Sequence, residues 1–388
     1  MPSRAELQDP IPLARALVAR ASVTPRDEGA LAVLEEALVA LGFAPERMAF
    51  GEGAERVENL FARRGEGRPH LCFAGHTDVV PEGEAGAWTH APYAAEIVEG
   101  RLFGRGATDM KGAIAAFVAA LARADVPAIG TVSLLITGDE EGEARNGTRR
   151  VVGRLSERGE RIDQCLVGEP TNPSMLGEAV KVGRRGSLNA TIAVTGTQGH
   201  VAYPHLARNP IPALLQILRE MGARRLDDGA PDFDPSNLEV TDLEVGNPAT
   251  NVIPARAKAR INIRFNTAHR GADLAAWLAE TAERVAKAHG VEATVAAAIS
   301  GEAFYCAPGP FVALLSKAIA AETGHAPALS TSGGTSDARF IKDLCPVAEF
   351  GLVGATMHKV DEHVALADLE LLTRIYTRLL KSYFVPHE

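Results

Sequence analysis

The sequence predicts an α/β fold whose central sheet is mixed and flanked by helices, with a second, α+β unit inserted into it. Two observations support this prediction. Short apolar runs alternate with helical patterns in the first and last parts of the chain, whereas apolar and polar residues alternate along strands in the middle part. At 388 residues the chain also exceeds the size at which a single core stops growing, so about two domains are expected.

The first part of the chain begins with an amphipathic helix. It is indicated by leucines at helical spacing, which are Leu31, Leu34, Leu38 and Leu41. Asp27 and Glu28 are expected in its first turn, and Gly42 is expected to end it. Apolar runs at 71–74, 132–136 and 165–167 then predict buried strands, and the Ala-rich segment 112–124 predicts a helix that packs closely on the sheet.

The middle part of the chain has a different pattern. Residues 188–194 and 257–265 alternate between apolar and polar, which predicts strands with one solvated face. Helical patterns at 211–221 and 272–289 and further strands at 238–245 and 291–297 complete the order β-α-β-β-α-β, which is that of a ferredoxin-like unit. The chain then returns to a helix at 311–322 and a buried strand at 347–352.

Potential metal ligands follow the predicted buried strands. His76, the pair Glu140 and Glu141, and Glu169 each come after one of these strands, beside Gly. In an open α/β sheet, ligands bind beyond the carboxyl ends of the strands, so these groups are expected to converge there. Clustered carboxylates repel one another unless a cation or a proton neutralises them. With Asp109 and His358, also close to Gly, the set suits a pair of divalent ions such as Zn²⁺ and indicates metal-assisted hydrolysis.

Each of these residues also has a purely structural interpretation. A single His after a strand is usually a capping or hydrogen-bonding group, and a carboxylate beside Gly usually belongs to a turn or a helix N-cap. The metal hypothesis therefore depends on their joint occurrence. If His358 joins ligands from the first half, the catalytic domain is discontinuous, with 1–182 and 297–388 forming it and 183–296 inserted.

Composition limits the partners and the compartment. The formal charge of −9, with 46% hydrophobic and 23% charged residues, argues against nucleic acid or an anionic membrane as a partner. The four cysteines are scattered without CxxC spacing, which favours free thiols in a reducing cytoplasm. The N-terminus lacks the apolar core of a signal peptide, and no apolar run approaches the roughly 18 residues of a membrane span. We therefore expect a cytoplasmic protein.

Several segments resemble a known family. Residues 75–81 (GHTDVVP), 104–112 (GRGATDMKG) and 138–142 (GDEEG) resemble the M20 family of co-catalytic zinc aminoacylases and peptidases, and the resemblance covers nearly the whole chain. Segments 181–187, 198–205, 333–337 and 355–362 look most like those of members that hydrolyse the amide of N-succinyl-L,L-2,6-diaminopimelate to succinate and L,L-diaminopimelate, a step of lysine and diaminopimelate biosynthesis.

The resemblance implies a fold, a cofactor and an assembly. It implies a zinc-peptidase-like catalytic domain, and a homodimer formed through the inserted domain. It implies two Zn²⁺ ions per subunit, which Co²⁺ or Mn²⁺ can replace. His76 and Glu169 would bind one ion, His358 and Glu141 the other, and Asp109 would bridge the two.

Adjacent glutamates after a strand diverge, so one of them can bind metal while its neighbour takes the proton from the attacking water. The resemblance makes Glu140 the base and Glu141 the ligand. Asp78, two residues after His76, is expected to hold the imidazole in its metal-binding tautomer. By resemblance, His200 reaches the substrate carbonyl across the dimer and stabilises the developing oxyanion.

An anionic substrate needs a local group of cationic and hydrogen-bonding side chains in this acidic protein. The resemblance places substrate contacts at Arg184, Ser187, Tyr203, Asn251, Arg264, Gly334 and Thr335. Arginine offers bidentate recognition of carboxylates. Thr250, Ser332 and Ala338 depart from the pattern of these members, which leaves the metal ligands untouched and puts details of substrate contact in doubt.

Two alternative functions remain open at this point. One is N-acetylornithine deacetylase, or another aminoacylase or dipeptidase of the family. The other is a non-catalytic binding protein on the same fold, against which the complete set of ligands and a base counts.

Overall fold

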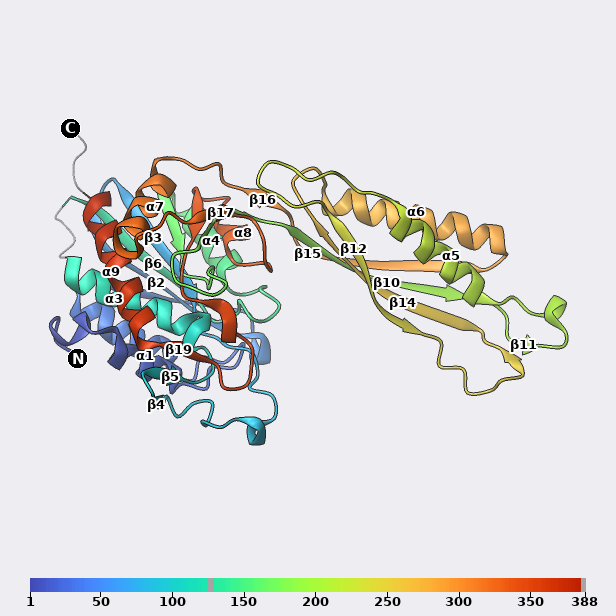
Figure 1. Cartoon of the computed structure of the whole chain (residues 1–388), viewed down its shortest axis with the longest axis horizontal. Helices are drawn as coiled ribbons and strands as arrows, with labels where there is room; N and C mark the ends of the chain where they lie inside the picture. The colour runs from blue at the N-terminus through green and yellow to red at the C-terminus, as the bar shows by residue number, and fades with distance from the viewer. Residues whose placement is uncertain (125–128, 385–388) are drawn as a thin grey trace. The chain divides into compact units, whose positions relative to one another are not determined.

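The computed structural model describes residues 1–124 and 129–384, and these form two compact units (Figure 1). The sheet unit comprises Met1–Val182, Cys306–Ser330 and Ser336–Glu388, within the described residues, and the inserted unit comprises Gly183–Tyr305 with Thr331–Thr335. The boundary expected after residue 296 is wrong in position, because 296 lies inside strand β15 (Glu292–Gly301) and the inserted unit continues to Tyr305.

The sheet unit is built on a mixed eight-stranded sheet. Its strands, in spatial order, are β1 (Ala44–Phe50), β2 (Val57–Glu66), β6 (Gly130–Thr137), β3 (His70–His76), β7 (Gln164–Val167), β18 (Val347–Glu349), β8 (Ala179–Lys181) and β17 (Ala328–Ser330). The central strands β6, β3, β7 and β18 are parallel, while β1, β2 and β8 introduce antiparallel pairings. A smaller sheet contains β4 (Ile97–Val98), β5 (Arg101–Phe103) and β19 (His363–Ala365).

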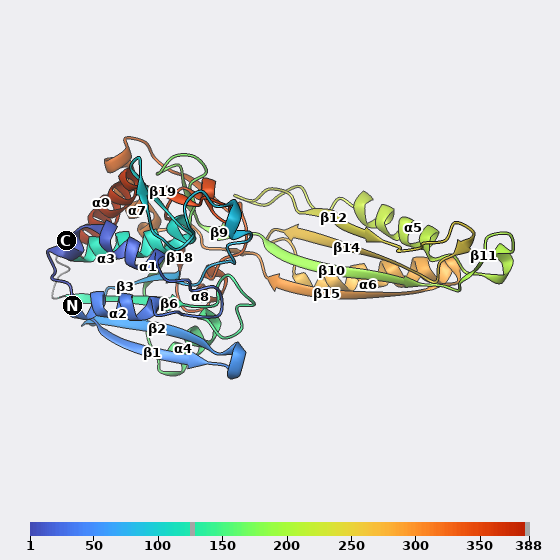
Figure 2. The ribbon, with the colours of Figure 1, turned by 90° about the horizontal axis from the view of Figure 1, so that it is seen from below.

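The apolar runs form strands that are buried on both faces. Every residue of β3 and β6 is buried, as a strand covered by helices on both sides must be. Phe73 of β3 stacks on Phe117 of α3 (Gly112–Ala124), with ring centroids 4.1 Å apart, and Tyr376 of α9 (Leu366–Tyr383) meets both rings edge-on. These contacts place α3 and α9 side by side on one face (Figure 2).

The other helices of the sheet unit are α1 (Pro10–Val18), α2 (Ala30–Ala40), α4 (Thr148–Glu157), α7 (Pro310–Thr323) and α8 (Ala338–Ile341). The prediction that Asp27 and Glu28 lie in the first turn of α2 is wrong. Asp27 precedes the helix, and its carboxylate accepts the backbone N–H groups of Gly29 and Leu31 at 3.0 and 2.8 Å. Glu28 has a positive φ of 47°, so neither acid lies within the helix.

The inserted unit has the predicted β-α-β-β-α-β order. Its elements are β10 (Gly186–Thr195), α5 (Pro210–Ala223), β12 (Asn237–Glu244), β14 (Arg256–Phe265), α6 (Gly271–His289) and β15. The sheet order β12-β14-β10-β15, with every pairing antiparallel, is that of a ferredoxin-like unit. Two short pairings are added, β11 (Gly199–His200) with β13 (Val252–Ile253), and β9 (Gly183–Arg184) with β16 (Phe304–Tyr305).

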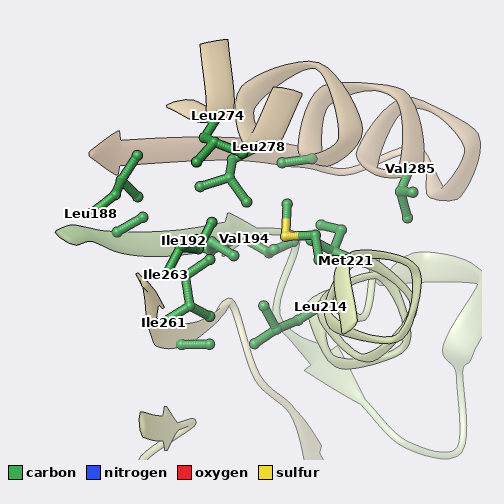
Figure 3. Close-up of a cluster of buried hydrophobic side chains, with 14 of the residues drawn as sticks. Leu188, Ile192, Val194, Leu214, Met221, Ile261, Ile263, Leu274, Leu278 and Val285 are labelled. Atoms are coloured by element: carbon green, nitrogen blue, oxygen red, sulfur yellow. The ribbon is translucent and has the colours of Figure 1, made fainter. Parts of the chain in front are cut away.

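The core of the inserted unit lies between its sheet and its two helices (Figure 3). Alternate residues of β10 and β14 are buried, and their side chains face the apolar faces of α5 and α6. The labelled members of this core are Leu188, Ile192, Val194, Leu214, Met221, Ile261, Ile263, Leu274, Leu278 and Val285. The intervening polar residues face the other side, so the alternation seen in the sequence reflects one buried and one solvated face. In the described part of the chain, no helix is both long and apolar enough to cross a membrane.

Candidate metal centre and active site

The candidate ligands lie at the ends of neighbouring parallel strands. His76 is the last residue of β3, Glu140 and Glu141 follow β6, and Glu169 follows β7. Because β6, β3 and β7 are parallel neighbours, their carboxyl ends open on the same edge of the sheet. His358 joins them from the segment after the short helical turn Gly354–Thr356.

Asp109 connects two groups of potential ligands. Its Oδ1 lies 3.3 Å from His76 Nε2, which is itself 3.7 Å from Glu169 Oε1. Its Oδ2 lies 3.1 Å from His358 Nε2, which is 2.8 Å from Glu141 Oε1. Within each group the ligand atoms all lie within 4.8 Å of one another, so each group can hold one cation and share Asp109.

The electrostatics of the cluster favour a bound cation. Burial lowers the pKa of His76, but the hydrogen bond to Asp109 and the charge of Glu169 outweigh it and leave that pKa well above its usual value. Hydrogen bonds to Asp109 and Glu141 raise the pKa of His358 to about 10. The carboxylates thus draw protons onto both imidazoles, and divalent ions would neutralise the same negative charge.

Glu140 stands beside this cluster and belongs to a third group, with His76 and Glu141. Burial raises the pKa of Glu140 well above its usual value, and the negative charge of Glu169 adds to the shift. A carboxylate with a raised pKa is a better proton acceptor, and this is the property that a general base needs.

Asp78 does not hold the His76 imidazole as expected. The carboxylate of Asp78 is 3.7 Å from His76 Nδ1, whereas its backbone carbonyl is 2.9 Å from that nitrogen. The carboxylate instead accepts the backbone N–H groups of Glu140 and Glu141, at 3.2 and 3.0 Å. Fully buried Asp78 therefore fixes the loop that carries both glutamates, and burial raises its pKa to about 6.

The segment around Asp109 is held by an ion pair that the sequence interpretation missed. Fully buried Glu362 accepts the backbone N–H groups of Thr108 and Asp109 at 3.1 and 3.2 Å, and it pairs with Arg105 at 2.8 Å. Both residues lie in segments that were noted for the family resemblance, at 104–112 and 355–362. The pair could have been predicted because the two motifs carry residues of opposite charge, and each motif also contains a candidate ligand.

The glycines before the candidate ligands His76 and Glu169 allow close packing. A Cβ added at Gly75 would lie 2.5 Å from Met110 Cε, and one added at Gly168 would lie 2.7 Å from the same atom. Met110 follows Asp109, so these two glycines let the Asp109 segment lie directly on the ends of β3 and β7.

The backbone conformation of His358 is also unusual, with a φ of 60° that few residues other than Gly adopt.

Asp337 is a further buried carboxylate in the sheet unit. It is 6% exposed, and among the described residues neither of its oxygens has a hydrogen-bond partner. Burial raises its pKa, and its charge contributes to the raised pKa of Glu140. The sequence analysis identified the segment 333–337 by its resemblance but predicted no role for Asp337, because an Asp after Ser carries no signal of its own.

The predicted substrate contacts all lie in the inserted unit, but in two separate places. Arg184 donates to the Gly334 carbonyl at 3.1 Å, and Ser187 pairs in register with Arg264. His200 and Tyr203 pack together with ring centroids 5.8 Å apart.

Asn251 lies beside them, since its carbonyl accepts the Val201 N–H at 3.1 Å. Ser187 is the second residue of the ten-residue strand β10, while β11, which contains His200, lies beyond the other end of β10 (Figure 1). A strand of this length spans about 30 Å, so one chain does not bring the two groups together. Thr335 is the last residue of the segment Thr331–Thr335 that belongs to this unit.

The family model described as peptidase family M20/M25/M40 matches residues 72–382. The chain belongs to the M20 family. A succinyl-diaminopimelate desuccinylase of Caulobacter vibrioides (strain NA1000 / CB15N) is 59% identical over 377 residues, covering 97% of this chain and 96% of the relative. The protein of the same name from Rhodospirillum centenum is 56% identical over 384 residues, covering 98% of each.

Solved structures of family members share the fold. A metallo-carboxypeptidase from Sulfolobus solfataricus aligns with a TM-score of 0.77 at 16% identity, over 97% of this chain and 99% of that one. A dinuclear metal-binding peptidase from Bacillus subtilis aligns with a TM-score of 0.69 at 17% identity, over 98% of each chain. The predicted fold class, a zinc-peptidase-like domain with a ferredoxin-like insertion, is confirmed.

Proposed function

We propose that this member of the M20 family hydrolyses the amide bond of N-succinyl-L,L-2,6-diaminopimelate to succinate and L,L-diaminopimelate. The relatives named for this activity are similar along almost the full chain. The observation that carries the proposal is the pair of ligand groups that share Asp109, with the unassigned carboxylate of Glu140 beside them. A binding protein has no need of such a base, so the hydrolytic function is favoured over the binding function.

The donor set fits two Zn²⁺ ions, with Co²⁺ or Mn²⁺ as substitutes. Each group offers one imidazole and one carboxylate besides the shared Asp109, and nitrogen with oxygen ligands suits zinc. His76 and Glu169 would hold one ion, and His358 and Glu141 the other. When bound, the ions supply Lewis-acid activation of water and of the amide carbonyl.

Glu140 is the group that takes the proton from the attacking water. It lies within the cluster, and its raised pKa gives it the affinity for that proton. Protonated Glu140 can then give the proton to the departing amine, so one residue serves both steps. Asp78 keeps Glu140 and Glu141 in their separate positions by binding both backbone N–H groups.

His200 would act on a site in the partner subunit of a homodimer formed through the inserted unit. His200 is exposed, and it lies at the opposite end of that unit from Ser187 and Arg264. Two chains related by a twofold axis can bring the two ends together, whereas one chain does not. The imidazole would then stabilise the oxyanion that forms from the substrate carbonyl.

The three carboxylates of the substrate need several cationic and polar partners. Arg184 and Arg264 offer forked donors for carboxylates. Arg184 contacts Gly334, which precedes Thr335 in the chain, and Arg264 is paired in register with Ser187. Tyr203 and Asn251 form the second group, with His200. N-acetylornithine has fewer carboxylates, so its binding would leave part of this set unpaired, at a cost of several tenfold steps in kcat/KM. We propose a cytoplasmic location, in keeping with biosynthesis of a small amino acid.

A comparison of substrates tests the assignment. kcat/KM is measured for N-succinyl-L,L-diaminopimelate and for N-acetylornithine with the zinc-loaded protein, in wild type and in Arg264→Ala. We expect a strong preference for the succinylated compound, reduced in the variant. A wild-type preference for the acetylated compound would contradict the substrate assignment but not the assignment as a hydrolase. Elemental analysis should find two zinc ions per chain, and full activity with one would overturn the two-ion centre.

A further inference from the structure

The sheet unit has an arginine-rich hollow outside the candidate active site. It has a volume of about 1000 Å³ and lies between β1 and α4, which are neighbours in Figure 2. Its lining includes six arginines but only two glutamates, Glu46 and Glu157, in a protein whose net charge is −9. The six are Arg47, Arg145, Arg149, Arg150, Arg154 and Arg158.

Four of the six arginines have acidic partners. Arg158 binds Glu46 with both of its terminal nitrogens at 2.6 Å, and Arg154 lies 3.5 Å from Glu157. The pairs Arg47 with Glu35 and Arg145 with Glu143 use acids outside the lining. The positive charge of these four guanidinium groups is therefore already offset by neighbouring carboxylates.

Arg149 and Arg150 differ from the other four. Among the residues that the structure describes, neither has a carboxylate within 4.0 Å, and both are exposed. The Arg150 guanidinium lies over the ring of Phe50, 5.2 Å from its centroid. Stacking of this kind holds the group in place while its N–H donors stay free at the edge.

The position of these two arginines on α4 is electrostatically unfavourable without a ligand. They occupy its first turn, which contains no acidic residue, and Gly147 provides no side-chain cap. The N-terminus of a helix carries partial positive charge, so two cations there are repelled by the helix dipole and by each other.

We propose that this hollow binds an anion that contains a diphosphate group. Phosphate oxygens match the forked donors of arginine, and a diphosphate concentrates several negative charges in a group small enough to contact Arg149, Arg150 and the start of α4 together. A single carboxylate would neutralise only one of the two unpaired guanidinium groups. The same diphosphate chemistry is offered by free pyrophosphate and by a nucleoside diphosphate.

Isothermal titration with pyrophosphate and with ADP tests the proposal on the zinc-loaded protein. The test variant is Arg149→Ala/Arg150→Ala, and the matched control is Arg101→Ala/Arg161→Ala, which removes two exposed charges of the same unit away from the hollow. We expect saturable binding by wild type and control, and at least about tenfold weaker binding by the test variant. Binding of either anion to the metals would be common to all three proteins, so the difference between variants reports on the hollow.

The relative affinities identify the source of the diphosphate. Equal affinity for the two compounds would indicate that the diphosphate alone is recognised, whereas tighter binding of ADP would indicate a nucleotide, and both results support the site. Arg149→Lys/Arg150→Lys keeps the charge but removes the forked donors, so it should bind severalfold more weakly than wild type. This variant still tests the site if the alanine variant misfolds. No saturable binding by wild type, or equal binding by the test variant and the control, would overturn the proposal.

Discussion

The carboxylate of Glu362 accepts the backbone N–H of Asp109 at 3.2 Å, although 253 residues separate them in the chain. The same carboxylate forms a buried ion pair with Arg105, so it holds both the start of the 104–112 segment and its candidate ligand, Asp109. Asp109 itself faces His76 with one oxygen and His358 with the other. A side chain that binds no metal in our proposal therefore fixes the residue that joins the two ligand groups.

We expect Glu362→Gln to weaken both metal binding and stability. The amide leaves the buried Arg105 charge uncompensated, which should cost about 3 kcal/mol in the free energy of unfolding. Loss of support for Asp109 should lower metal affinity about tenfold to a hundredfold. Metal titration and chemical denaturation measure the two effects. Glu370→Gln is the control, since it breaks a partly exposed pair with Arg123 and should cost less than about 1 kcal/mol.

Glu140→Gln should keep the fold and the metals while losing turnover. The amide cannot accept the proton, and the proposed ligands are unchanged, so kcat should fall by about 10²- to 10⁴-fold. Steady-state kinetics with metal analysis provide the measurement. Glu143→Gln, an exposed residue of the same loop that pairs with Arg145, should leave kcat unchanged. Retention of more than about a tenth of wild-type turnover by Glu140→Gln would remove Glu140 from the role of base.

Mixing two inactive proteins tests action across a dimer. His200→Ala and Glu140→Gln each lose activity alone, but a mixed dimer would contain one intact site if His200 serves the partner. An equal mixture should regain about a quarter of wild-type turnover, because half of its dimers are mixed and each has one intact site. Glu140→Gln mixed with His358→Ala should regain nothing. Absence of recovery in the first mixture, with subunit exchange demonstrated, would contradict the proposed role.

Asp227 makes the stability of the inserted unit depend on pH. Burial raises its pKa, but hydrogen bonds from Ser236, Gly229 and Asn266 outweigh this and hold the pKa well below its usual value. A carboxyl whose pKa is lowered by folding stabilises the fold above its unfolded pKa, near about 3.9, and this contribution disappears as the pH falls through the folded value.

We therefore expect Asp227→Asn to cost about 2 kcal/mol in the free energy of unfolding at pH 7. The difference from wild type should shrink at pH values below about 4, as wild-type Asp227 takes up its proton. Urea denaturation at several pH values measures this. Asp228→Asn, whose exposed side chain pairs with exposed Arg225, should have little effect at any pH. A loss for Asp227→Asn that is independent of pH would contradict the assignment of the shift.

Much of the fold follows from periodicity in the sequence. The segments that became β3, β6 and β7 are continuous apolar runs because the strands are buried on both faces, and β10 and β14 alternate because only one face is buried. Element ends were less predictable. Asp27 precedes α2 instead of entering it, because the choice between cap and first turn depends on which backbone N–H groups its carboxylate reaches.

The sequence by itself determined which candidate ligands follow buried strands, because a His or carboxylate beside Gly after an apolar run is a local feature of the chain. Only the tertiary structure decided what each group contacts. Asp78 was expected to serve His76, two residues away, but its carboxylate binds the loop after β6, because the adjacent parallel strands bring that loop to it. Likewise, Arg184 and His200 are only 16 positions apart, yet the extended strand β10 places them at opposite ends of one unit. Spacing along a chain fixes distance only within one element, and contacts between elements depend on how they pack.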